Sequence, residues 1–416
     1  MRRPILIVAF VLVVIGIGVL IYFLFFKGMV TPANNANNAG TNGTLPISNN
    51  LVNRITANTV VNGLPIVNGS VTNVDTTKAP EPIARGGRTI TQTVTDGTAI
   101  SPASTTDGST IVYYDPATGK FYKVSRDAKT RIELTSQTFP DAQSVVWSPT
   151  RDRAIIAFPD QSRILYNFTT QVQTTLPKEW SDVTFSPDGG QVAYKYLSGD
   201  ENTQWLAVSN PDGTEVKGIE PVGDKADSVQ VAWSPNNQFV ALYHSNTDAT
   251  GQEVLPIGFN GENFQSFKVD GQGFDGKWSP TGDRLLYTTY GSSSNYNPSL
   301  TIANVSGQTV GTGKQALSIQ TWVDKCAFSG DGSSLYCAVP NSLPEGSGIY
   351  RELSNSIPDT FWKIDLSTGL KTPVAIPVTE RGTGSYSARN VFLSPGGQFI
   401  YFTDVSTGRL ERIQLK

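Results

Sequence analysis

The chain has 416 residues, of which 38% are hydrophobic and only 16% are charged, with 39 Gly and 25 Pro. This composition is typical of many short strands joined by tight turns and argues against a helical protein. The net charge is −3 and no Lys/Arg run stands out in the body of the chain, so we expect no nucleic-acid partner. With one His (His244) and two Cys, we expect neither a metal nor another cofactor.

Residues 5–26 form an uninterrupted apolar run, ILIVAFVLVVIGIGVLIYFLFF. As a helix it would be about 33 Å long, enough to cross a hydrocarbon core of roughly 30 Å. Arg2 and Arg3 precede the run, which predicts a cytoplasmic N-terminus and an exported body. A cleaved signal peptide is the alternative, but the run is long and ends without a small-residue cleavage motif. We therefore expect residues 1–27 to be an uncleaved signal anchor in the cell membrane.

Residues 28–86 are rich in Asn, Thr, Val, Gly and Pro and carry few charges. This composition predicts a flexible linker with a mean reach of about 40 Å. The segment LVNRITANTVVNGLPIVNG has recurrent apolar residues, and its packing against the following domain is the alternative.

A short motif recurs after residue 90: an aromatic or apolar residue, a Ser-Pro-type turn, and then a β-patterned run. The residues before the turns are Ile100, Trp147, Phe185, Trp233, Trp278, Phe328 and Leu393, with spacings of 47, 38, 48, 45, 50 and 65 residues. A period of 40–50 residues with four strands per copy is typical of propeller blades. We predict an all-β, seven-bladed β-propeller over residues 87–416, with six or eight blades as alternatives.

The last copy supplies too few strands for a complete blade, whereas RTITQTV (88–94) is a β-run without a blade of its own. We predict that this run completes the last blade and closes the ring, which would remove exposed sheet edges.

The Ser-Pro-Asp-Gly-type blade openings resemble those of TolB-type and WD-repeat-like bacterial propellers over about residues 88–416. The resemblance implies a protein-binding platform. That family also includes propeller halves of peptidases, but no hydrolase domain follows the repeats here.

Catalytic and metal-binding motifs are not evident in the sequence. There is no G-x-S-x-G elbow, and nothing around His244 supports a catalytic triad. The Asp-Gly pairs at 188, 212 and 331 lack the full calcium-loop pattern and are interpreted as turns. We therefore expect no enzyme activity and assign no catalytic residue.

Cys326 and Cys337 flank the turn at Asp331-Gly332 and are expected to face each other on antiparallel strands. A disulfide is chemically permitted in an exported domain. The alternative is that both are small buried thiols, because other copies have Val at the position of Cys326.

Two long connections are the best candidates for a partner surface. In 340–359 a short helix would carry Ile349, Tyr350 and Leu353 on one face, and Tyr350, Arg351 and Leu353 are the candidates there. In 379–390 the candidates are Arg381, Tyr386 and Arg389. We expect a membrane-tethered, extracytoplasmic interaction or scaffold module that binds an envelope protein and is not an obligate homo-oligomer. A glycan hydrolase or lyase, or a carbohydrate or small-ligand binder, are the alternatives.

Overall fold

A computed structural model describes residues 78–260, 262 and 264–416, all within the second of the two compact units, 1–56 and 57–416. The predicted membrane helix and most of the predicted linker lie outside these residues. Among the described residues no helix is long and apolar enough to cross a bilayer. The described part is all-β, with 28 strands and six short 3-10 helices.

Five of the sheets contain four strands in chain order, as the repeat predicts. The first two are β2 (Ile100–Ser104), β3 (Thr110–Asp115), β4 (Lys120–Ser125) and β5 (Arg131–Glu133), and β6 (Ser144–Trp147), β7 (Arg153–Ala157), β8 (Arg163–Asn167) and β9 (Gln173–Leu176). The third is β10 (Trp180–Phe185), β11 (Val192–Tyr196), β12 (Trp205–Ser209) and β13 (Lys217–Pro221). The next two are β14 (Val229–Val231), β15 (Phe239–Asn246), β16 (Gly251–Gly258) and β17 (Phe267–Asp270), and β18 (Gln272–Trp278), β19 (Arg284–Tyr290), β20 (Ser299–Asn304) and β21 (Thr312–Ala316).

The remaining sheet has eight strands in the order β22-β23-β24-β25-β1-β28-β27-β26. Its strands are β1 (Arg88–Thr93), β22 (Cys326–Phe328), β23 (Ser334–Pro340), β24 (Asp359–Asp365), β25 (Lys371–Val378), β26 (Ala388–Leu393), β27 (Phe399–Asp404) and β28 (Leu410–Gln414). The 3-10 helices are η1 (Glu201–Thr203), η2 (Gly223–Ser228), η3 (Ser292–Ser294), η4 (Gly307–Thr309), η5 (Val323–Lys325) and η6 (Arg351–Ser354).

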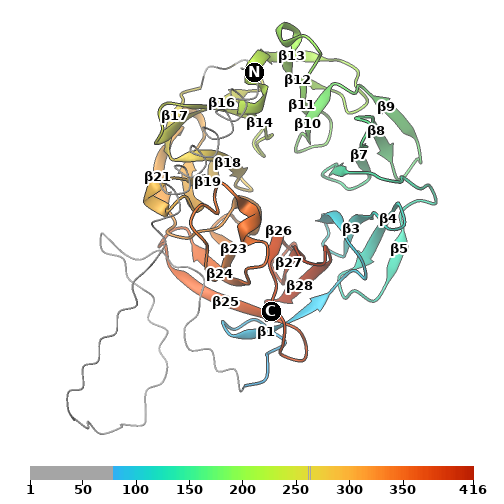
Figure 1. Cartoon of the computed structure of the whole chain (residues 1–416). Helices are drawn as coiled ribbons and strands as arrows, with labels where there is room; N and C mark the ends of the chain where they lie inside the picture. The colour runs from blue at the N-terminus through green and yellow to red at the C-terminus, as the bar shows by residue number, and fades with distance from the viewer. Residues whose placement is uncertain (1–77, 261, 263) are drawn as a thin grey trace, which may run out of the picture. The chain divides into compact units, whose positions relative to one another are not determined.

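Within residues 78–416 the sheets are arranged around a central axis (Figure 1), and the first strands of neighbouring sheets contact one another. Apolar clusters fill the spaces between adjacent sheets. In one of them Tyr114 and Phe121 of the first sheet meet Trp147 and Tyr166 of the second. Each sheet is covered on both faces, so the middle strands are buried continuously, as β11 shows with Ala193 and Lys195 both under 6% exposed.

The closing strand is found where the sequence predicted it. Residues 91–93 of β1 pair antiparallel with β28 and so complete the last group of strands (Figure 1). Residues 88–90 also pair in parallel with β25, which the sequence did not predict. Because one strand bonds to two neighbouring groups, β1 joins them into the eight-stranded sheet and hides both edges.

The end of the predicted linker packs on the sheets. The backbone N–H of Ala84 donates to Gln414 and that of Gly86 to Val374, at 2.8 Å each, and Glu81 bridges to Thr89. Residues 81–86, which the sequence assigned to the linker, therefore bond to the strands of the domain.

The turns after the first strands explain the repeated motif. In the third sheet the Ser186 hydroxyl donates to Asp188 at 2.6 Å, and the N–H of Gly189, at φ +72°, donates to the Ser186 carbonyl at 2.9 Å. In the first sheet this turn is built by Thr105, Asp107 and Gly108. The residue before that turn is therefore Ser104 and not Ile100, because the first copy has Thr where the others have Ser.

Candidate functional site

Three regions of the described chain carry functional candidates: the axis of the ring, the loops over β19–β24, and a cavity beside β1. The Asp-Gly turns are not among them. Hydrogen bonds from neighbouring Ser and Thr side chains lower the pKa of Asp107 and of Asp331 to about 2, so these carboxylates serve their own turns. Within the described residues no group of three or more His, Cys, Asp or Glu is arranged to hold a metal ion.

A polar side chain occurs at one level, four residues before the Ser or Thr that opens each turn; six of the seven lie on the first strand of a group, and Lys325 ends η5 just before β22. These residues are Ser101, Ser144, Asp182, Gln230, Asp275, Lys325 and Asn390. Ser101, Asp182 and Asn390 have φ near +50°, and the ladder shifts register next to each of them. A bulge turns a side chain out of the regular alternation. The sequence contained this polar level, but it could not show the bulges.

A cavity of about 550 Å³ lies at this level between β10, β14 and β18. Its polar lining comprises Asp182, Lys195, Asp227, Gln230, His244 and Asp275. The Gln230 amide donates to Asp275 at 3.0 Å, and the Lys195 ammonium lies 2.5 Å from Asp182. Burial, and then the Asp324 charge, raise the pKa of Asp275, whereas burial, and then Lys195, lower that of His244. Burial therefore favours the uncharged form of the His244 ring, whose Nδ1 lies 3.3 Å from the Gln252 amide nitrogen.

The two long connections predicted as a partner surface meet at one end of the strands. The N–H groups of Gly346 and Gly348 donate to the carbonyls of Asn295 and Tyr296, at 2.9 and 2.8 Å, and so fix 340–359 to the β19–β20 loop. The N–H of Asp359 donates to the Tyr386 carbonyl at 2.9 Å, which links 340–359 to 379–390.

An apolar surface results from this contact. Its members, called the apolar loop patch below, are Tyr296, Ile349, Tyr350 and Leu353, which are between 42% and 59% exposed. The other exposed large apolar residues of the described chain are scattered over separate turns and strands: Ile132, Val172, Trp205, Val216 and Leu370. The expected short helix is the single 3-10 turn η6, and Tyr296 was missed because its own loop is short.

Arg351 helps to hold the loop that carries Ile349, Tyr350 and Leu353 of the patch. Its guanidinium contacts both carboxylate oxygens of Asp324 at 2.7 Å and stacks on Trp322 at 4.8 Å. Nearby, the buried Lys325 ammonium lies 2.8 Å from Asp359, whose other oxygen accepts from the Ala388 N–H at 2.6 Å. These contacts hold η6 and β26 in fixed positions, so Arg351 positions the loop and its charge is neutralised.

The other three predicted residues are divided between two places. Arg389 is half-buried and donates to Asn355 at 2.7 Å, and burial lowers its pKa. Tyr386 packs edge-on against Phe402, and burial raises its pKa to about 12. Arg381 is exposed and, with Tyr386, lines the cavity beside β1.

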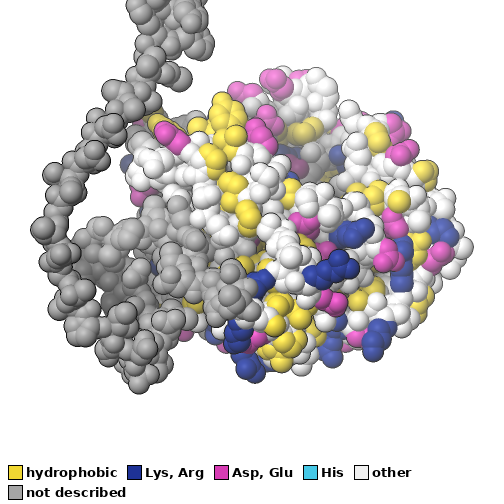
Figure 2. Space-filling view, turned by 60° about the horizontal axis from the view of Figure 1, so that its bottom comes forward, with side chains coloured by type: hydrophobic (Ala, Val, Ile, Leu, Met, Phe, Trp, Pro, Cys, Tyr) yellow, Lys and Arg dark blue, Asp and Glu magenta, His cyan; other side chains and the backbone are white. Residues whose placement is uncertain are grey.

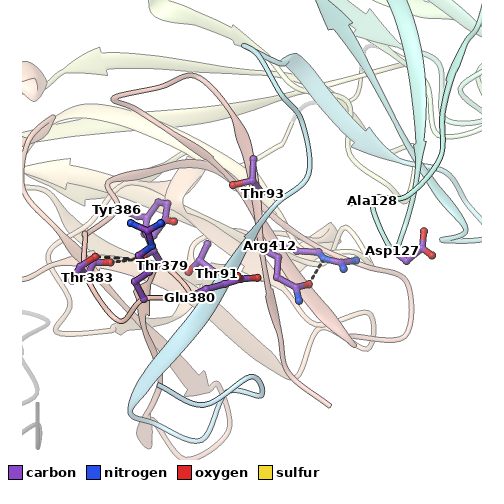
Figure 3. Close-up of a pocket in the computed structure, with 11 residues that line it drawn as sticks. Thr91, Thr93, Asp127, Ala128, Thr379, Glu380, Thr383, Tyr386 and Arg412 are labelled. Atoms are coloured by element: carbon purple, nitrogen blue, oxygen red, sulfur yellow. Dashed lines mark hydrogen bonds between the residues drawn. The ribbon is translucent and has the colours of Figure 1, made fainter. Parts of the chain in front are cut away.

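The cavity beside β1 has a volume of about 710 Å³. It is lined from β1 by Thr91, Gln92 and Thr93, from the β25–β26 connection by Thr379, Glu380, Arg381, Thr383 and Tyr386, from the β4–β5 turn by Asp127 and Ala128, and by Arg412 of β28. Figure 3 shows that the space extends to both sides of β1, with Tyr386 and Thr383 on one side and Arg412 on the other.

Buried polar groups in the wall of this cavity, and Glu411 beside Arg412 in the chain, are incompletely paired. Glu411 is 3% exposed, one of its oxygens accepts from Thr93 at 3.1 Å, and the other has no partner. Burial raises its pKa to about 7. The Thr91 hydroxyl and one terminal nitrogen of Arg412 also have no hydrogen-bond partner. No sequence signal indicated these groups, because they meet only when β1 returns to β28.

The two cysteines are opposite each other, in the register that the sequence predicted. Cys326 on β22 pairs with Cys337 on β23, their Cα atoms are 4.1 Å apart, and the sulfur atoms are bonded. Both are fully buried.

Comparison with known proteins gives the fold class and nothing finer. No protein-family model matches the chain, and no curated protein matches its sequence. Among solved structures, the β-propeller domain of Cps50 (Swd1) from Myceliophteria thermophila is similar with a TM-score of 0.53 at 10% identity, covering 79% of this chain and all of that one. TolB from Acinetobacter baumannii matches with a TM-score of 0.41 at 14% identity, over 64% and 62% of the two chains. Oligogalacturonate lyase from Vibrio parahaemolyticus matches with a TM-score of 0.48 at 11% identity, over 78% and 93%. The first likeness and the ring of four-stranded sheets define the described domain as a β-propeller.

Proposed function

We propose that this protein is a seven-bladed propeller, tethered to the outer face of the cell membrane, that acts as a protein-interaction or scaffold module of the cell envelope. The apolar loop patch carries the proposal. Contiguous exposed apolar side chains mark interaction sites, whereas singly scattered ones do not.

The patch has the character of a binding surface. Two of its four residues are Tyr, a residue enriched at the energetically dominant positions of interfaces. Backbone hydrogen bonds and the Arg351–Asp324 contact already hold the loops that carry it. A partner would therefore bind a pre-organised surface and lose little conformational entropy from this side.

The proposed count of seven blades is supported by dividing the eight-stranded sheet at β1. Strands β22–β25 then form one blade, and β26–β28 with residues 91–93 form the last. No nucleic-acid partner is proposed, since Lys and Arg side chains are interspersed with Asp and Glu ones on the face in Figure 2. A closed ring also needs no second copy, so we propose a monomer.

The tether and the compartment rest on the apolar run 5–26 and the two arginines before it. Export would place the Cys326–Cys337 pair in an oxidising environment, where a disulfide persists. Protein isolated from its source membranes should therefore gain no alkylation at either cysteine unless it is first reduced. Free thiols in freshly isolated protein would contradict the exported location.

Site-specific crosslinking tests the interaction. A photoreactive residue replaces Tyr350 in the full chain, and the matched control replaces Val172, which is equally exposed at 58% against 59% but lies in the β8–β9 connection. Illumination of source membranes should give one stoichiometric protein adduct from position 350 and none from 172. The proposal fails if position 350 gives no adduct, or if both positions give the same products.

The cavity of about 550 Å³ between β10, β14 and β18 favours a second candidate, a small-ligand binder or an enzyme. Two carboxylates of the polar level, Asp182 and Asp275, border one cavity with His244. Titratable groups whose pKa values are shifted by burial inside a cavity, as those of Asp275 and His244 are, mark candidate functional sites. Under this candidate, Asp275→Asn abolishes binding or turnover of a glycan ligand and leaves crosslinking at 350 unchanged.

A further inference from the structure

Arg412 is a buried cation without a counter-ion. Its side chain is 8% exposed, and a guanidinium stays charged and has five N–H donors. The structure gives it one hydrogen bond, from Nε to Gln92 at 2.9 Å, and leaves a buried terminal nitrogen without a partner. No carboxylate oxygen of the described residues lies within 4.0 Å of it. Burial of an unpaired charge is costly, so a missing partner is expected.

The side chain that partly compensates the buried charge of Arg412 is an aromatic ring, that of Phe399. The guanidinium lies 4.9 Å from the Phe399 ring centre, which holds its plane and supplies a weak cation–π attraction. Such a contact is made by the face of the guanidinium and does not satisfy the terminal N–H donors that Gln92 leaves free. These donors form the fork that suits a carboxylate or a phosphate.

The environment leaves room for such a group. Figure 3 shows Arg412 pointing from β28 past β1 toward the turn with Asp127 and Ala128, into the cavity of about 710 Å³. Small-molecule sites have volumes of roughly 300–1,000 Å³. Arg381 supplies a second cation, while Asp127 and Glu380 are acidic members of the lining.

Asp127 is engaged in its own turn. Its carboxylate accepts from the Ser125 hydroxyl at 2.6 Å and from the Lys129 N–H at 3.2 Å, and the Lys129 ammonium lies at 4.0 Å. It therefore contributes charge near the cavity without neutralising Arg412.

We propose that the cavity beside β1 binds a small anionic ligand whose carboxylate or phosphate group is held by the guanidinium of Arg412. This site is separate from the apolar loop patch and does not depend on the interaction function. The Gln92 side chain fixes the orientation of Arg412 from β1, so the ligand also sits against the strand that closes the ring.

The test uses the full chain in detergent micelles with two probes, inorganic phosphate and succinate, and isothermal titration as the readout. Arg412→Met removes the charge and keeps the apolar stem, and Arg412→Lys keeps the charge and removes the fork. The matched control is Arg126→Met, because Arg126 also lies near Phe399, at 5.9 Å, but is exposed and does not line the cavity. Melting temperatures without probe establish that each variant is folded.

We expect at least one probe to bind the wild type in the millimolar range or tighter. Arg412→Met should weaken that binding at least tenfold, Arg412→Lys should weaken it less, and Arg126→Met should change it less than twofold. Binding of phosphate alone or of succinate alone identifies which anion the site takes.

Three results would overturn the proposal. The first is a wild type that binds neither probe. The second is a folded Arg412→Met variant that binds each probe as the wild type does. The third comes from combining Arg412→Met with Asp127→Asn without probe. Melting-temperature changes that fail to add would mean that Asp127 already serves as the counter-ion.

Discussion

Two buried cations show how differently two regions of this propeller are built. Lys195, in the sheet of β10–β13, is 5% exposed and contacts the carbonyls of Ala226 and Val229 and the carboxylate of Asp182. Arg412, in the closing group of strands, is 8% exposed and has one hydrogen bond. Buried polar groups are normally satisfied, so the difference needs a structural reason.

The reason lies in how each region is assembled. Strands β10–β13 follow one another in the chain, whereas the closing group takes its fourth strand from residues more than 300 positions away. Within the described residues, the closing group also contains four of the six buried side-chain atoms without a partner: those of Thr91, Thr403, Glu411 and Arg412. The comparison shows that buried polar atoms without a hydrogen-bond partner are concentrated in the strands that close the ring.

The largest effect on stability is expected when the contacts between the β1 segment and β28, which close the ring, are disrupted. The N–H of Val94 donates to the Leu410 carbonyl at 2.8 Å, and its side chain is 7% exposed. Val94→Ala should cost about 2 kcal/mol of unfolding free energy through lost packing. Val94→Pro also removes the donor, leaving a buried carbonyl unpaired, and should cost about 1–3 kcal/mol more. Urea unfolding of both variants measures the difference, and equal stabilities would mean that this bond contributes nothing to closure.

Much of the fold could be predicted from the sequence because each sheet is locally encoded. Ser186-Pro187-Asp188-Gly189 specifies its turn through contacts within four residues, and a copy of this chemistry recurs in each sheet. The first copy was misplaced by four residues because Thr105 performs the role of Ser.

The candidate sites were predicted less completely. Tyr350 and Leu353 belong to the patch, but Tyr296 joins it only through hydrogen bonds between two loops. Arg351 was expected at the surface; its side chain is partly exposed, and the salt bridge to Asp324 that neutralises it was not predicted. Such contacts between different sheets depend on the ring geometry, which spacing alone does not specify.

The pH dependence of stability tests a single unpaired group of the closing strands, the carboxyl of Glu411. Burial raises the pKa of Glu411 from 4.5 to about 7, with Asp404 adding to the increase and Thr93 and Arg409 opposing it. Protonation therefore favours the folded state, and this contribution is complete below about pH 4.5 and is lost as the pH rises through 7. The shift corresponds to at most about 3 kcal/mol.

Glu411→Gln removes that charge. The variant should be more stable than the wild type at pH 8, by about 1–3 kcal/mol, and the advantage should vanish near pH 4.5. Glu380→Gln is the control, because Glu380 lines the same cavity but is exposed. Unfolding free energies at several pH values measure the effect, and a difference independent of pH would show that Glu411 is not buried as a titrating carboxyl.

The smallest effect separates a paired hydroxyl from an unpaired one on the same strand. Thr91 is 4% exposed and its hydroxyl has no partner, whereas the Thr93 hydroxyl donates to Glu411 at 3.1 Å. Thr91→Val exchanges an unpaired buried hydroxyl for a methyl of similar shape, so it should leave stability unchanged or raise it by up to about 1 kcal/mol. Thr93→Val removes the one donor to a buried carboxylate and should cost about 1–2 kcal/mol at pH 8, where Glu411 is charged. Valine suits a strand as well as threonine does, so backbone preference does not distinguish the two variants. If Thr91→Val is the more damaging of the two, its hydroxyl has a partner in solution and the closing strands are better satisfied than their geometry indicates.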